Sequence, residues 1–199
     1  MDTDCRPTPS WSHLLADLID SAQVTDLTGR QVAQNAAFLE ARDLILAVRS
    51  ASRKVMVVGN GGSAAIASHL QTDLAHGMGV RALVFTEPAT LTAQANDHGY
   101  ENAYSNLTNL WTEHGDLLVA ISSSGRSANI LNACLAARAK GARLITLSGF
   151  NADNPLRSLG DLNFYVSSSE YGAVESSHAV IVHHLTDQVL ASIPAKVQR

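Results

Sequence analysis

Short aliphatic runs alternate along the chain with longer segments in which apolar residues recur every three or four positions. Each run is typical of a strand buried on both faces, and the runs lie at 54–58, 82–85, 117–121, 143–147 and 162–166. Helices are predicted beside them at 63–75, 91–95, 103–111, 128–140 and 174–192. This alternation predicts an α/β fold, a doubly wound parallel sheet flanked by helices.

A helical prefix is predicted before the first strand, with amphipathic helices at 11–21 and 30–51. Such a prefix often forms an oligomer contact, and packing against the chain's own sheet is the alternative. The polar, proline-containing start of the chain predicts a disordered leader. The expected organisation is therefore a leader at 1–10, N-terminal helices at 11–52 and an α/β domain at 53–195.

The composition fits one globular domain. Of the 199 residues, 46% are hydrophobic and 16% are charged, which excludes an intrinsically disordered chain. The net charge of −4 offers no basic field for a phosphate backbone, so we expect no nucleic-acid partner. The start of the chain does not read as a signal peptide, and no apolar stretch reaches the ~18–20 residues of a membrane span. We therefore expect a cytoplasmic protein with no membrane partner.

The two cysteines, Cys5 and Cys134, fit neither a disulfide framework nor a CxxC metal pattern. Cys134 falls on the apolar side of the helix predicted at 128–140, so we expect a core thiol. This usage is typical of a reducing compartment.

Two loops at strand ends carry small and hydroxyl residues directly before a helix. They are Gly59-Asn-Gly-Gly-Ser63 and Ser122-Ser-Ser-Gly-Arg-Ser127. Glycine lets the backbone approach an anion, and helix N-termini and serine hydroxyls supply donors. Turn and capping chemistry is the alternative for either loop alone, but two such loops in one sheet favour a phosphate. The spacing matches neither a dinucleotide fingerprint nor a nucleotide-triphosphate loop, so a smaller phosphorylated molecule is the expected ligand.

Candidate acid–base residues lie on two helices. His69 and Asp73 are four residues apart and so share one helix face. The last helix carries Glu175 and a set of histidines, and the pattern alone leaves the choice open among His178, His183 and His184. A histidine paired with a carboxylate can transfer protons near neutral pH, and such a set can also hold zinc.

The motifs Gly59-Asn-Gly-Gly-Ser-Ala-Ala65, Ala95-Asn-Asp97 and Ile121-Ser-Ser-Ser-Gly-Arg-Ser-Ala-Asn129 resemble those of sugar isomerase (SIS) domain proteins. The resemblance is strongest to phosphoheptose isomerases, covers about residues 30–192, and agrees in the order and spacing of all motifs. It implies conversion of sedoheptulose 7-phosphate to glycero-manno-heptose 7-phosphate through an enediol. It also implies a homotetramer with sites at subunit interfaces.

By position, the resemblance assigns roles to particular residues. It places the phosphate on the serines Ser63, Ser122, Ser124 and Ser127. It places the sugar on Asn60, Asp97 and Glu175. It makes Asp73 the catalytic base and selects His183 as the catalytic acid. It further implies a zinc site formed by His69, Asp73, Glu175 and His183.

Three positions depart from the family pattern. Asp73 stands where the family has the longer Glu, Glu175 stands where it has Gln, and Ser176 replaces the Glu that follows. These differences suggest a subfamily that uses another phosphosugar or depends more strongly on metal. Arg126, where Asn is common, either adds a charge for the phosphate or faces solvent.

Two other functions are weighed against isomerisation. Some SIS proteins bind a replication initiator without catalysis, and others sense sugar phosphates. The acid–base set of His69, Asp73 and His183 remains in this sequence, which favours chemistry. The sensing function ranks last, because these residues include no DNA-binding pattern.

Overall fold

The computed structural model describes residues 10–194. All but Ser10 of the leader predicted at 1–10, and Cys5 with it, lie outside the described residues. The helices are α1 (Trp11–Asp20), α2 (Gln34–Ser50), α3 (Gly62–Thr72), α4 (Pro88–His98), α5 (Ala103–Trp111), α6 (Ala128–Ala139) and α7 (Tyr171–Ala191). The strands are β1 (Gln23–Asp26), β2 (Gln31–Val32), β3 (Lys54–Gly59), β4 (Arg81–Val84), β5 (Leu117–Ser122), β6 (Arg143–Ser148) and β7 (Leu162–Tyr165).

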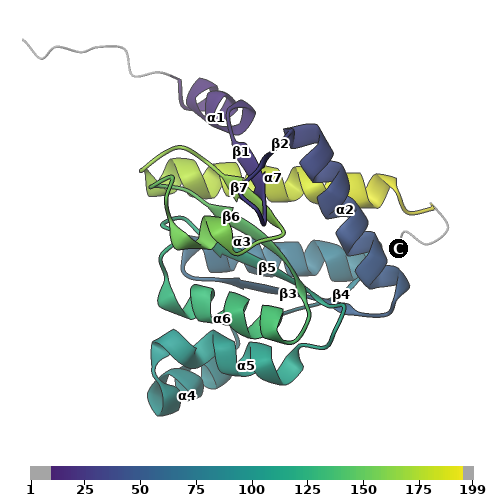
Figure 1. The fold of residues 1–199 in the computed structure, drawn as a ribbon, viewed down its shortest axis with the longest axis vertical. Helices are drawn as coiled ribbons and strands as arrows, with labels where there is room; N and C mark the ends of the chain where they lie inside the picture. Colours follow the sequence, from purple (N-terminus) through teal and green to yellow (C-terminus); the bar gives the residue numbers. More distant parts are fainter. Residues whose placement is uncertain (1–9, 195–199) are drawn as a thin grey trace, which may run out of the picture.

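One seven-stranded sheet, in the order β2-β1-β7-β6-β5-β3-β4, forms the centre of the molecule. The strands from β7 to β4 in that order pair in parallel, which confirms the predicted doubly wound fold. Helices α4, α5 and α6 lie on one side of the sheet, and α2 and α7 lie on the other (Figure 1).

The aliphatic runs fold as strands because both of their faces are buried. In β3, Val55 and Val57 point into the core shared with α2, α3 and α7. Met56 and Val58 point into the opposite core, which α5 and α6 cover. The predicted core thiol Cys134 lies in that second core, and burial raises its pKa to about 12.

The expectation that two helices precede any strand is wrong. The antiparallel hairpin of β1 and β2 separates them, and β1 extends the sheet by pairing with β7. Val24 anchors this strand because it is buried and lies opposite Phe164. The hairpin turns at Gly29, whose φ is +82°, while the Asp26 carboxylate accepts hydrogen bonds from Thr28 and Arg30. Residues 11–52 thus contribute to the same sheet and core as the rest.

Several helices begin or end at other residues than expected. Helix α4 begins early, because the Glu87 carboxylate accepts hydrogen bonds from the backbone N–H groups of Ala89 and Thr90. Helix α7 begins at Tyr171, three residues before the expected start at 174. The helix expected at 63–75 instead changes to a π-helical turn at Asp73–Gly77. None of the helices within residues 10–194 is long and apolar enough to cross a membrane.

Candidate active site

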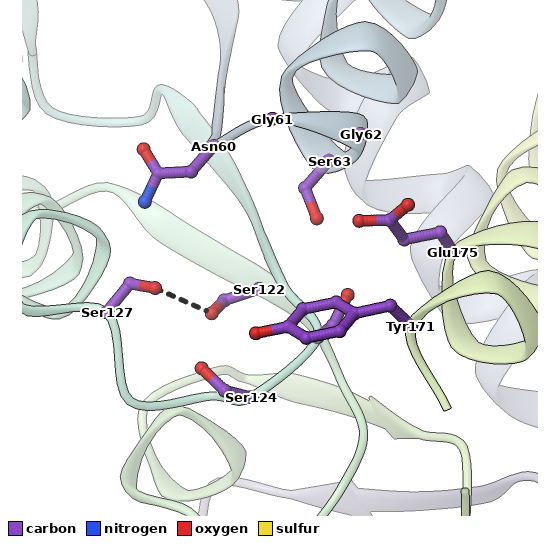
Figure 2. Close-up of a pocket in the computed structure, with 10 residues that line it drawn as sticks. Asn60, Gly61, Gly62, Ser63, Ser122, Ser124, Ser127, Tyr171 and Glu175 are labelled. Carbon is purple, nitrogen blue, oxygen red and sulfur yellow. Dashed lines mark hydrogen bonds between the residues drawn. The ribbon is translucent and has the colours of Figure 1, made fainter. Parts of the chain in front are cut away.

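The two loops singled out in the sequence meet at the carboxyl ends of neighbouring strands. Strands β3 and β5 pair in parallel up to Gly59 and Ile121, so the segments that follow them lie side by side. Between them is a cavity of about 240 Å³. We call it the serine pocket (Figure 2), and it is lined by Asn60, Gly61, Gly62, Ser63, Ser122, Ser123, Ser124, Ser127, Tyr171 and Glu175.

The second loop directs several hydroxyls into the serine pocket. Ser122 ends β5, and its hydroxyl donates to Ser127 Oγ at 3.3 Å. Gly125 allows the turn between them, because its φ is +61° and any side chain there would collide with Asn154. Ser123 is only 4% exposed, and its hydroxyl has no hydrogen-bond partner among the described residues.

The first loop brings a helix N-terminus to the same cavity. Gly61 takes φ +53°, and α3 begins at the next residue. Among the described residues the N–H groups of Gly62 and Ser63 make no backbone hydrogen bond, so they are free to bind an anion, whereas the Ala64 N–H donates to the Gly61 carbonyl at 3.0 Å. Gly59 lets α3 approach β3 closely, because a Cβ there would lie 2.6 Å from the Ser63 carbonyl. The two loops together form an anion-binding cradle.

Asn60 joins the two loops. Its Nδ2 donates to Asn129 Oδ1 at 3.0 Å, and Asn129 Nδ2 donates back to Asn60 Oδ1 at 2.9 Å. The hydroxyl of Tyr100 donates to the same Asn60 oxygen at 2.8 Å. Asn60 lines the pocket, and its amide also links the two loops.

Helix α7 supplies one wall of the serine pocket through Tyr171 and Glu175, which are one turn apart. The Glu175 carboxylate lies against Gly62 so closely that any side chain at position 62 would collide with it. Glu175 therefore faces the start of α3 and the serine pocket.

A second group forms where α3 and α7 run alongside each other. The rings of His69 and His183 have centroids 4.8 Å apart. Asp73 Oδ2 lies 3.5 Å from His69 Nε2 and 3.9 Å from His183 Nδ1. We call these three residues the His–Asp cluster. One nitrogen or oxygen from each residue lies within 4.8 Å of the others, an arrangement able to transfer protons or hold a metal ion.

The π-helical turn begins at Asp73 itself. A π turn inserts an extra residue into the helix and displaces the backbone locally, and such turns are frequent at functional sites. Asp73 still reaches both histidines despite having one methylene fewer than Glu. Asp73 thus lies at the residue where the helical backbone departs from α geometry.

The other two histidines of α7 lie elsewhere. His178 is fully buried, and its Nε2 is 3.1 Å from the Ser148 carbonyl oxygen. Burial lowers its pKa to about 4. The His184 ring packs edge-on against Phe38 at 4.5 Å. Of the three candidates, His183 is the one that the fold brings to Asp73.

The structure does not bring all predicted site residues together. Asp97 is exposed on α4, where its carboxylate accepts a hydrogen bond from Asn96, and it lines no part of the serine pocket. Glu175 is not a member of the His–Asp cluster. Asp73 and His183 line a separate cavity of about 310 Å³. Arg126 is paired with Asp153 at 3.2 Å on the surface.

Three residues of the serine pocket and its supports are not identified by the sequence patterns. Ser123 lies between two serines that match the family pattern, and nothing in the sequence distinguishes it. Asn129 ends the third motif, and its pairing with Asn60 becomes visible only in the structure. Tyr171 lay outside the predicted helix, although its position four residues before Glu175 is a usable signal once α7 is extended.

Both the sequence and the fold of this chain are similar to those of known proteins. The sequence matches the SIS domain family over residues 21–149. It is 34% identical over 191 residues to a phosphoheptose isomerase of Geobacter sulfurreducens, covering 86% of this chain and 97% of that protein. It is 37% identical to a phosphoheptose isomerase of Rhodospirillum rubrum, covering 75% of this chain and 82% of that one. The structure of a phosphoheptose isomerase from Francisella tularensis superposes with a TM-score of 0.77 at 25% identity, covering 90% and 92% of the two chains.

Proposed function

Because this chain belongs to the SIS domain family and is an isomerase of the phosphoheptose isomerase type, we propose that it converts sedoheptulose 7-phosphate to glycero-manno-heptose 7-phosphate. The serine pocket would hold the phosphate, since its hydroxyls and the N-terminus of α3 are donors for an anion. Binding energy from this remote group would position the reacting carbons.

The observation that carries the proposal is the approach of Asp73 to His183 from two different helices. In the proposed reaction Asp73 takes a proton from C1 of the ketose, which gives an enediol, and returns that proton to C2. His183 moves a proton between O1 and O2, so the carbonyl passes from C2 to C1. A positioned acid and base of this kind contribute about 10²–10⁴-fold to a rate.

Zinc suits the His–Asp cluster. His69, Asp73 and His183 offer two imidazole nitrogens and a carboxylate oxygen, a donor set typical of catalytic zinc sites with an open position. These three residues would hold the ion, and Glu175 would not, because it faces the serine pocket. A bound zinc would supply Lewis-acid polarisation of the substrate oxygens instead, in place of proton transfer by the side chains that ligate it.

We also propose that the chain acts as a homotetramer in which neighbouring copies complete each site. In the single chain the side chains of His69 and His183 are 54% and 55% exposed, which is more open than a water-excluding active site requires. Surface for assembly is available on the N-terminal helices, where Trp11 and Leu39 are 54% and 44% exposed.

The direct test is an assay of sedoheptulose 7-phosphate by NMR, with and without chelator and with added Zn²⁺. We expect an aldoheptose 7-phosphate as product. Asp73→Asn and His183→Gln should each lower kcat by at least about a hundredfold, because each removes one proton-transfer group. Thermal stability and affinity for inorganic phosphate should stay unchanged in both variants.

His184→Gln is the matched control, because this neighbouring histidine packs against Phe38 and should leave kcat unchanged. Full activity of Asp73→Asn or His183→Gln would contradict the assignment. Binding of the sugar phosphate without product under every condition would favour the alternative, a non-catalytic SIS protein. Turnover of a different phosphosugar alone would keep the chemistry and change the substrate.

A further inference from the structure

We propose that Tyr171 is a substrate-binding residue whose hydroxyl donates a hydrogen bond to the phosphate in the serine pocket and whose ring covers the pocket's open side. This inference rests on the proposed function for the identity of the anion. It assigns a role to a residue outside the motifs that carry the family resemblance.

Tyr171 is placed to reach a ligand in the serine pocket. It is the first residue of α7 and lines the cavity, yet 62% of its surface is exposed. Figure 2 shows its phenolic oxygen pointing across the pocket toward Ser122 and Ser124. Figure 2 marks no hydrogen bond between this hydroxyl and the other pocket residues drawn, so the donor is available to a ligand in the pocket.

The ring of Tyr171 is held by a neighbour that is itself fixed. Its centroid lies 4.8 Å from that of Phe150, with the two planes at 76°. Phe150 has φ +57°, which is uncommon for a bulky residue and indicates strain. Two hydrogen bonds maintain this conformation: the Phe150 N–H donates to the Ser168 carbonyl at 2.9 Å, and its carbonyl accepts from Tyr165 at 2.7 Å. The surrounding structure thus positions the ring before any ligand binds.

The charges around the serine pocket explain why the Tyr171 hydroxyl matters for binding an anion. None of the described residues that line the serine pocket is Lys or Arg, and Glu175 adds a carboxylate. Arg126 is paired with Asp153 instead. An anion in this pocket is therefore held by neutral O–H and N–H donors against one negative charge. Under these conditions each additional donor to the anion matters, because hydrogen bonds to charged groups are the strong ones.

The test is a calorimetric titration of the full chain with inorganic phosphate, together with steady-state kinetics on sedoheptulose 7-phosphate. Tyr171→Phe keeps the ring and removes the hydroxyl, so the Kd for phosphate should rise roughly tenfold. KM should rise by a similar factor, with kcat unchanged. Tyr171→Ala should weaken binding further, because the pocket also loses its cover.

Ser192→Ala is the matched control. It removes an exposed hydroxyl at the other end of α7, one that donates to the Gln188 carbonyl, and should leave both constants unchanged. Thermal melting of each variant checks the fold, and the exposed position of Tyr171 predicts no change.

Wild-type affinity in Tyr171→Phe would overturn the inference, and so would a wild-type protein that does not bind phosphate. If the wild type binds phosphate, Tyr171→Phe binds it more weakly, and no product forms, the inference stands and the proposed function fails. The titration and the assay therefore separate the two failures.

Discussion

The three histidines of α7 show how the surroundings of one residue type set its chemistry. His178 is fully buried against the Ser148 carbonyl, His183 lies half-exposed beside Asp73, and His184 packs on Phe38. Nδ1 of His178 has no partner among the described residues. Its imidazole can remain neutral in the core, whereas protonation there would bury an unpaired charge.

His178 should make stability depend on pH. Burial lowers its folded-state pKa from 6.5 to about 4, although the Ser148 contact opposes the shift. Because the unfolded chain binds the proton more readily, this stabilisation is complete above pH 6.5 and is lost as the pH falls toward 4. The loss should reach about 3 kcal/mol, measured by urea denaturation at pH 7.5 and 4.5.

His178→Gln is the comparison that isolates this effect. It cannot titrate, so its free energy of unfolding should change less between the two pH values, even though the variant is less stable at pH 7.5. An equal pH dependence in wild type and variant would assign the effect to other groups. Asp26 does not interfere with this comparison. Hydrogen bonding from Thr28 lowers the pKa of its carboxyl from 3.8 to about 2, so the stabilisation that it contributes is lost only below the pH range compared.

At the scale of elements, the site depends on where helices and loops deviate from regular geometry. The change from α-helix to π turn at Asp73 sets the position of the proposed base. The reciprocal amide pair of Asn60 and Asn129 sets the distance between the two loops of the serine pocket. The π turn and the amide pair can each be tested by one substitution.

Asp73→Glu tests whether the π turn is matched to the shorter side chain. The extra methylene should carry the carboxylate past its present position beside His69 and His183, although it restores the family's residue. Since a misplacement near 1 Å can cost about a hundredfold in rate, we expect kcat to fall by roughly 10- to 100-fold with phosphate affinity unchanged. A variant more active than wild type would show that the backbone does not compensate.

Asn129→Ala tests the link between the loops. Asn129 is 3% exposed, so its removal leaves the Asn60 amide partly unpaired inside the protein. We expect a loss of about 1–3 kcal/mol in the free energy of unfolding and weaker binding of inorganic phosphate. Asn132→Ala on the same helix, which removes only a bond to the Glu101 carbonyl, should leave phosphate binding unchanged.

At the scale of the molecule, the parallel sheet could be predicted because each of its strands carries its own aliphatic signal. Strand β1 could not, since Gln23–Asp26 contains a single aliphatic residue, Val24, and the strand pairs with β7 far along the chain. For the site, sequence spacing identified the loops and the His69–Asp73 pair. The choice of His183 came from the family resemblance, because only the packing of α7 against α3 separates it from its neighbour His184.

Assembly is also a property of the whole molecule. Light scattering should give a mass near four times 21.1 kDa if the chain is a homotetramer. Leu39→Glu places a charge on the exposed side of α2 and should lower that mass and the activity together, because a charge is costly in an apolar contact. A monomeric wild type would contradict the proposed homotetramer. If Leu39→Glu remained a tetramer, the contact between subunits would lie elsewhere than at Leu39.

The pairing of Val24 with Phe164 has a consequence for synthesis on the ribosome. Translation adds about 5–20 residues per second, so β1 is made roughly ten seconds before the strand it needs. Until then its partner is β2, and an isolated two-stranded hairpin is marginally stable. The chain must therefore be synthesised as far as Tyr165 before this edge of the sheet can form.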